Sequence, residues 1–249
     1  MNEQRKVDKK NELKLLSLEE MQQFNDEGYL MFPEFFNEEW DQEMTQALEE
    51  LQVINPDSKA IVPHPTFNKL LLDKAFLGIV RSLLGEEFLF HHANGRSLSP
   101  ADTGKVWHHD YDGVGNWKPG EPLMIHLLVY PEGVDANKGA LAILPKSHLR
   151  EVQRSEPNAH VLGSLEGEIE VSGKPGLLVV LNSALWHSRR LNSTSVRRPY
   201  FNFSFCQFGS ERPERKEYGH MLQAIKEALN GQLDDSVSMM LQSDTLKRR

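Results

Sequence analysis

Apolar residues in the first third of the chain recur with the spacing of amphipathic helices, and residues that favour helix ends separate these stretches. Three helix starts and two helix ends are marked: Ser17 with Glu20 as a capping box, Asn37 as an N-cap, a third start near Asp73, and Gly28 and Gly85 as stops. The residues after Gly28 can continue as a short strand over 29–32. We therefore predict a mainly helical segment over residues 17–85.

The hydrophobic pattern changes over residues 86–209, where the apolar runs are short and rich in valine, leucine and phenylalanine. Glycine, proline, asparagine and aspartate lie between these runs, which are Phe88–Phe90, Met124–Tyr130, Ala140–Leu144, Leu177–Leu181 and Tyr200–Phe208. Many short strands separated by turns are typical of a sandwich, a jelly roll or a barrel. This segment is predicted to form the β core of the molecule.

Helical periodicity returns from Glu214 to Leu229, and Asn230 with Gly231 stops it. The sequence shows no internal repeat and no low-complexity linker. We predict one domain over residues 1–249, with a loose tail over 1–16, a helical flank over 17–85, the β core over 86–209, and a C-terminal helix and tail over 210–249. The predicted fold class is therefore mainly β with flanking helices.

Composition narrows the class of protein. Of the 249 residues, 39% are hydrophobic and 26% are charged, which is typical of a soluble globular domain. The formal net charge of -8 argues against nucleic acid or an anionic membrane as the main partner. The lone cysteine, Cys206, cannot form an internal disulfide, which suits the cytoplasm. The sequence has no apolar run long enough to span a bilayer, and residues 1–12 lack the apolar core of a secretory signal.

Candidate metal ligands lie at positions 108–110 of the predicted β core. In an extended segment the side chains of residues i and i+2 point the same way, so His108 and Asp110 can reach one point while His109 points away. His187 follows a buried apolar run and is a natural third ligand, because antiparallel strands bring distant segments together. Two histidines and one carboxylate leave open positions on an octahedral metal, as in non-haem iron(II) oxygenases.

The segment that begins at Arg198 reads as a strand with two different faces. Period two places Arg198, Tyr200, Asn202 and Ser204 on one face and Phe201, Phe203 and Phe205 on the other. The phenylalanine face belongs against the core, so the polar face lines a cavity. An arginine there can pair bidentately with a carboxylate. A dicarboxylate that chelates the metal at one end and meets Arg198 at the other fits this pattern.

Taken together, these motifs resemble the phytanoyl-CoA dioxygenase family of iron(II)/2-oxoglutarate oxygenases. The matching segments are Trp107–Asp110, Gly139–His148, His187 followed by Asn192 and Arg198, and Phe24–Tyr29 as the entry from helix to strand. Arg198 lies eleven residues after His187, as the family pattern expects. Two departures stand out, since His109 occupies a position that is often glutamine, and Arg189 and Arg190 replace residues that are often small.

The resemblance, which runs from about Ser17 to Phe208, implies a double-stranded β-helix, the jelly roll of the cupins. It also implies that His108, Asp110 and His187 bind iron(II), and that Arg198 holds the distal carboxylate of the cosubstrate 2-oxoglutarate. The implied reaction consumes O2, releases succinate and CO2, and oxidises a C–H bond of a small-molecule substrate, with hydroxylation as the default outcome.

Four further residues are weaker candidates. His126 lies on the inward face of the strand 124–130 and either contacts the cosubstrate or is a hydrogen-bonded core histidine. Tyr111 and Asp112 follow the metal motif and either touch the substrate or form a turn with the glycine after them. Arg189 either binds an anionic substrate or belongs to a solvated basic edge.

Two rival functions stay open at the level of the sequence. A non-catalytic jelly-roll binding module would hold no tight iron and would not turn over 2-oxoglutarate. A cosubstrate-independent metal enzyme on the same fold would bind iron and leave 2-oxoglutarate unconsumed, and Arg198 would then serve the substrate.

Overall fold

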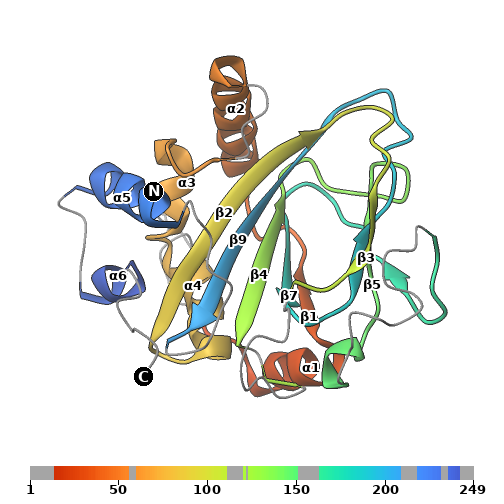
Figure 1. The fold of residues 1–249 in the computed structure, drawn as a ribbon, viewed down its shortest axis with the longest axis horizontal. Helices are drawn as coiled ribbons and strands as arrows, with labels where there is room; N and C mark the ends of the chain where they lie inside the picture. The colour runs from red at the N-terminus through yellow and green to blue at the C-terminus, as the bar shows by residue number, and fades with distance from the viewer. Residues whose placement is uncertain are drawn as a thin grey trace, which may run out of the picture.

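Two antiparallel β-sheets face each other across an interior space (Figure 1). The computed structural model describes residues 14–55, 60–110, 120–121, 123–150, 163–208, 218–230 and 235–241. The larger sheet has the strand order β1-β7-β4-β9-β2, formed by Tyr29–Phe32, Leu177–Asn182, Met124–Tyr130, Arg198–Gln207 and Phe88–Leu98. The smaller sheet has the order β3-β8-β5-β6, formed by Lys105–His108, His187–Arg189, Leu141–Ile143 and Ile169–Glu170. This arrangement confirms the predicted mainly β fold class.

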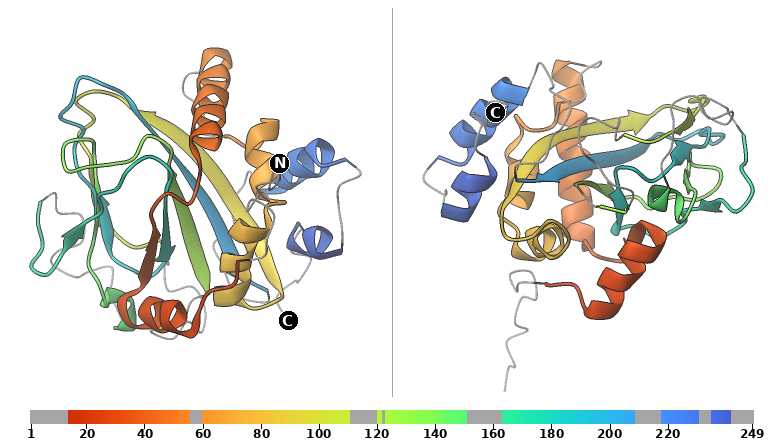
Figure 2. Two further views of the ribbon diagram at one scale, coloured as in Figure 1. Left: turned by 180° about the vertical axis from the view of Figure 1, so that it is seen from behind. Right: turned by 60° about the horizontal axis from the view of Figure 1, so that its bottom comes forward.

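Helices flank the larger sheet. They are α1 (Leu18–Glu27), α2 (Glu38–Ile54), α3 (Pro65–Leu70), α4 (Lys74–Leu84), α5 (Tyr218–Ala228) and α6 (Asp235–Met240), and a 3₁₀ turn, η2, covers Ser147–Leu149. Figure 1 and the reverse view in Figure 2 show α2 to α6 on the side of β2 and β9 that is turned away from the smaller sheet. One face of the larger sheet thus meets helices, and the other meets the space between the sheets.

The predicted helix boundaries in the first third are confirmed. Ser17 and Glu20 form the capping box of α1, and Gly28 ends that helix with a φ of 86°. Asn37 caps α2 and Asp73 caps α4, each through a side-chain oxygen that accepts a backbone N–H. Helix caps can be predicted from the sequence because they depend on residues only three or four positions apart.

Two points of the predicted organisation need correction. The short helices α3 and α6 were not predicted at all. The tail predicted to be loose over residues 1–16 is ordered at its end, because Leu16 is buried and its backbone N–H donates to Ser82 Oγ at 3.0 Å. Residues 1–13 of that tail lie outside the described residues.

Strand β9 connects the core with the space between the sheets. Its residues Phe201, Phe203 and Phe205 are fully buried against the helices, where the Phe76 ring of α4 meets the Phe203 ring edge-on at 5.5 Å. The alternate residues of β9 face the other way, as the two-residue period predicts. The aromatic packing therefore fixes the plane of a strand whose opposite face carries polar side chains.

Strand β2 changes its facing part-way along. Phe88 and Phe90 pack into the helix-side core, but Ala93 also packs there, although it is an odd number of residues away. The ladder with β9 is irregular between Phe90 and His92, where one residue is inserted. This β-bulge turns His92 and Asn94 toward the space between the sheets.

In the part of the chain that the structure describes, no helix has the length and apolar character needed to cross a membrane.

Replacing Phe76 with alanine is expected to lower the free energy of unfolding by about 3–5 kcal/mol, because the cavity left behind would separate α4 from β9. Urea denaturation followed by circular dichroism measures the change. As a control, Val53→Ala on α2, at a side chain that is 83% exposed, should change stability by less than about 0.5 kcal/mol. Similar losses for the two variants would contradict a core role for Phe76.

Candidate metal centre

The three predicted ligands converge between the sheets. His108 ends β3, Asp110 follows it, and His187 begins β8. His108 and His187 are direct partners in the β3–β8 ladder, and their ring centroids lie 4.1 Å apart. One ligand atom from each of the three side chains lies within 4.8 Å of the others, and no other group of three such ligands occurs among the described residues. The geometry suits a divalent metal with nitrogen and oxygen ligands.

Backbone carbonyls orient both imidazoles. Nδ1 of His108 donates to the carbonyl of Val106 at 2.8 Å, and Nδ1 of His187 donates to the carbonyl of Leu185 at 2.9 Å. A carbonyl can only accept, so the proton sits on Nδ1 and the lone pair sits on Nε2. Burial lowers the pKa of His187 to about 4, and burial together with His187 lowers that of His108 to about 3. Both rings are therefore neutral near pH 7, the form that binds a metal.

Asp110 lies among imidazole nitrogens. Its Oδ1 is 3.7 Å from Nε2 of His108, and its Oδ2 is 3.6 Å from Nε2 of His187 and 3.3 Å from Nε2 of His126. Burial alone would raise the pKa of Asp110, but the neighbouring histidines and Lys105 outweigh it and hold the pKa well below its usual range. The backbone N–H of Asp110 donates to the carbonyl of Ser183 at 2.9 Å, which fixes the turn after β3.

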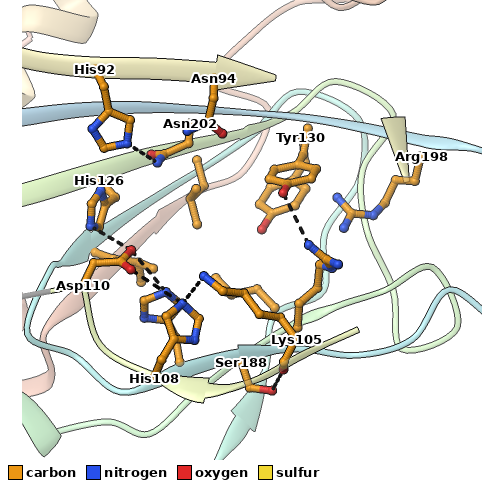
Figure 3. A pocket seen from close by; sticks show the side chains of 16 residues that line it. His92, Asn94, Lys105, His108, Asp110, His126, Tyr130, Ser188, Arg198 and Asn202 are labelled. Carbon is orange, nitrogen blue, oxygen red and sulfur yellow. Dashed lines mark hydrogen bonds and ion pairs between the residues drawn. The ribbon is translucent and has the colours of Figure 1, made fainter. Parts of the chain in front are cut away.

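A buried polar chain supports Asp110 from behind. Nδ1 of His126 lies 2.7 Å from Ser204 Oγ, which in turn lies 3.1 Å from Nε2 of His92. All three residues are buried, and they come from β4, β9 and β2 of the larger sheet. Figure 3 shows His92 and His126 on the same side of Asp110. These hydrogen bonds link the larger sheet to Asp110, the residue that follows β3 of the smaller sheet.

Arg198 marks the far end of the same cavity, which has a volume of about 180 Å³ (Figure 3). Its Nη2 donates to the carbonyl of Gly139 at 2.8 Å and its Nε to the carbonyl of Lys138. The guanidinium lies 5.1 Å from the Tyr130 ring centroid and 5.2 Å from that of Tyr200. Nη1 is buried and has no hydrogen-bond partner among the described residues. A buried cation with a free donor fits a carboxylate at this end of the cavity.

Residues 14–200 match the family model described as phytanoyl-CoA dioxygenase (PhyH), three quarters of the chain. The chain belongs to the phytanoyl-CoA dioxygenase family. This membership confirms the predicted oxidoreductase class and its dependence on iron(II), 2-oxoglutarate and O2.

Solved structures share the fold of this phytanoyl-CoA dioxygenase family member. HygX from Streptomyces hygroscopicus, solved with nickel and 2-oxoglutarate bound, superposes with a TM-score of 0.69 at 18% identity over 81% of this chain and 91% of that chain. SnoK, a non-haem α-ketoglutarate-dependent carbocyclase from nogalamycin biosynthesis, gives 0.67 at 17% identity over 84% and 90%. EctD from S. alaskensis gives 0.61 at 18% identity over 80% and 82%. These likenesses support the jelly-roll fold.

Arg189 of this family member lies in the cavity and not on a solvated basic edge. Its Nη2 donates to Asp102 Oδ1 at 2.7 Å, and its Nη1 donates to the Tyr200 hydroxyl at 3.4 Å. Burial alone would raise the pKa of Asp102, but the hydrogen bonds that it accepts from Gly104 and Arg189 contribute to holding the pKa below its usual value. Asp102 neutralises much of the charge that Arg189 brings to the site.

Lys105 is a cavity residue that the sequence pattern did not reveal. Its Nζ contacts Nε2 of His108, and Figure 3 shows the lysine side chain pointing at that ring. In a regular strand, residues three apart face opposite ways, so a pairing of Lys105 with His108 is not expected. The β3–β8 ladder is irregular between these two residues, which brings both side chains to the same face.

Of the remaining predictions near the metal-ligand motif at 108–110, one can be compared with the structure and two cannot. His109 points away as predicted, with its ring 5.5 Å from that of Trp186, and it does not line the cavity. Tyr111 and Asp112, for which the sequence left substrate contact and a turn as alternatives, lie outside the described residues.

Replacing His126 with leucine is expected to weaken Ni²⁺ binding by about 10–100-fold, because Asp110 loses the imidazole that holds its second oxygen. Isothermal titration calorimetry on the apoprotein measures the affinity, and nickel avoids oxidation during the titration. His64→Ala provides a control at a histidine outside the cavity and should bind as tightly as the unchanged protein. Unaltered nickel affinity in a folded His126→Leu protein would show that Asp110 needs no such support.

Proposed function

We propose that this dioxygenase oxidises an unactivated C–H bond of a small organic molecule, with His108, Asp110 and His187 as the iron ligands and Arg198 as the partner of the distal carboxylate of 2-oxoglutarate. One observation carries this assignment. The three convergent side chains lie at one end of a cavity and Arg198 lies at its other end (Figure 3), where Nη1 has no hydrogen-bond partner among the described residues.

Different residues of the chain bind the metal, bind the cosubstrate and orient the ligands in this proposal. Bound iron(II) supplies the redox chemistry that couples decarboxylation of 2-oxoglutarate to oxidation of the substrate by O2. His108 and His187 offer neutral Nε2 atoms, since each Nδ1 is held by a backbone carbonyl. Arg198 offers Nη1 to the far carboxylate, while Nε and Nη2 keep the guanidinium fixed. His126 holds the oxygen of Asp110 that faces β4.

The substrate is a small molecule in this proposal. The HygX structure with nickel, 2-oxoglutarate and hygromycin B bound shows that a protein of this fold accommodates a metal, the keto acid and a third compound together. In this chain Lys105 and the Asp102-bound Arg189 add positive charge to the cavity wall. Lys105 would leave Nε2 of His108 if that atom held a metal, and its ammonium group would then reach another acceptor in the cavity.

The first test measures succinate. Protein purified without oxygen is given iron(II) and 2-oxoglutarate, then O2, in the absence of a substrate. Slow succinate formation is expected, and it should vanish in His187→Ala, which lacks a ligand, while His109→Ala should retain it. Tight iron binding without succinate in both the unchanged protein and His109→Ala would favour a cosubstrate-independent enzyme. Absence of iron binding would overturn the proposed ligand set.

A second test addresses the arginine. Arg198→Lys keeps the charge but loses the planar fork, so the dissociation constant for 2-oxoglutarate should rise at least about tenfold. Binding is followed anaerobically by the visible absorption of the iron–keto acid complex. Arg197→Lys makes the same change at the exposed neighbour and should leave the affinity within about twofold. Equal affinities for the two variants would place the distal carboxylate elsewhere.

A further inference from the structure

A second hollow lies outside the metal centre. It is a groove of about 870 Å³ between α2 and the loops that follow β4 and precede β7, and it shares no lining residue with the metal-site cavity. This volume is within the range of small-molecule sites. Its charged lining residues are five acids and one lysine: Glu34, Glu38, Asp41, Glu49, Glu132 and Lys174. The groove thus presents a strongly negative surface.

Asp41 distinguishes this groove from an ordinary acidic surface. The residue is only 8% exposed, and its Oδ1 is buried without a hydrogen-bond partner among the residues that the structure describes. A buried carboxylate without a partner is costly. Burial, and then the neighbouring Glu38, raise the pKa of Asp41 to about 7. A cation bound in the groove would supply the partner that the described part of the chain does not provide.

The other carboxylates of the groove also favour a bound cation. Burial raises the pKa of Glu132, and Glu49 on α2 adds to the effect, while Lys138 and Arg198 oppose it. Glu132 comes from the loop after β4 and Glu49 from the helix, so like charges face each other across the groove. Repulsion between two separate elements is relieved when a positive ligand lies between them.

The spacing of the acids favours an extended organic cation over a metal ion. Among the described residues, only the His108–Asp110–His187 group brings three ligand atoms close enough for one metal. On α2, the lining residues Glu38, Asp41, Thr45 and Glu49 follow one another at helical spacing and extend over about 16 Å of helix axis. Phe36, Pro131 and Pro175 add apolar atoms to the lining of the groove.

We propose that this groove binds a linear polyamine, whose ammonium groups are separated by methylene segments, with Asp41 and Glu132 as its principal anchors. The ammonium groups pair with the carboxylates, and the methylene segments lie against the phenylalanine and proline surfaces. The site is independent of the metal centre and of the reaction proposed above.

Calorimetric titration of the full chain with spermidine at pH 8 and low ionic strength tests the proposal, because salt screens such contacts. Saturable binding at one site is expected. Asp41→Asn and Glu132→Gln should each weaken it at least about tenfold. Glu43→Gln makes the same charge change on α2 at a residue that pairs with Lys69 and does not line the groove, so it should cost less than about twofold.

Several outcomes would overturn the proposal. These are the absence of saturable binding, equal losses in Asp41→Asn and Glu43→Gln, binding of butylamine as tight as that of spermidine, or tighter binding of Mg²⁺ or of an oligolysine peptide. Asp41→Asn removes a buried charge, so its melting temperature at pH 8 should not fall, and lost binding then reports on the site. Spermidine affinity in His187→Ala should match the unchanged protein, and a loss there would place the ligand in the catalytic cavity.

Discussion

The site depends on the direct pairing of His108 with His187 in the ladder between β3 and β8. A ladder pair holds two side chains side by side on one face of a sheet, so two of the three proposed metal ligands are positioned by backbone hydrogen bonding. Asp110 joins them through the turn that the Ser183 carbonyl fixes. Two of the three proposed ligands thus lie on the smaller sheet, and the third directly follows its strand β3, so binding of a metal would cost little additional ordering.

The larger sheet contributes the surroundings of the metal. Its outer face packs against α4 through an aromatic core, and because this packing holds the strands in place, the inner face is rigid as well. From that rigid face come His126 and Ser204 behind Asp110 and, at the other end of the cavity, Arg198. A keto acid that bridges the sheets would thus be held between two independently braced surfaces, with the distance between its anchors set by the spacing of the sheets.

The sequence was most informative where the interaction is local or periodic. The alternation in β9 separated phenylalanines from cavity residues, and capping residues located three helices. The convergence of His108, Asp110 and His187 was predicted from a two-residue spacing joined to a distant histidine. Lys105 was not predicted as a cavity residue, because the irregular β3–β8 ladder breaks the two-residue alternation on which the prediction of cavity residues relied. Arg189 was ambiguous because its partner, Asp102, is 87 residues away and nothing in the sequence joins them. The helix α3, six residues long, is too short for its periodicity to be recognised.

The bulge in β2 reverses which alternate residues of the strand face the helices. Before it, even-numbered residues face the helices, and after it, odd-numbered residues do. Gly95, on the helix side, already leaves no room for a methyl group, since a Cβ there would lie 2.5 Å from Ile61 and 2.8 Å from Phe201. Without the inserted residue, the imidazole of His92 and the amide of Asn94 would be turned into that same phenylalanine-lined space. One extra position in the strand therefore decides whether these polar groups serve the cavity or disrupt the core, so in this strand residue count matters as much as residue identity.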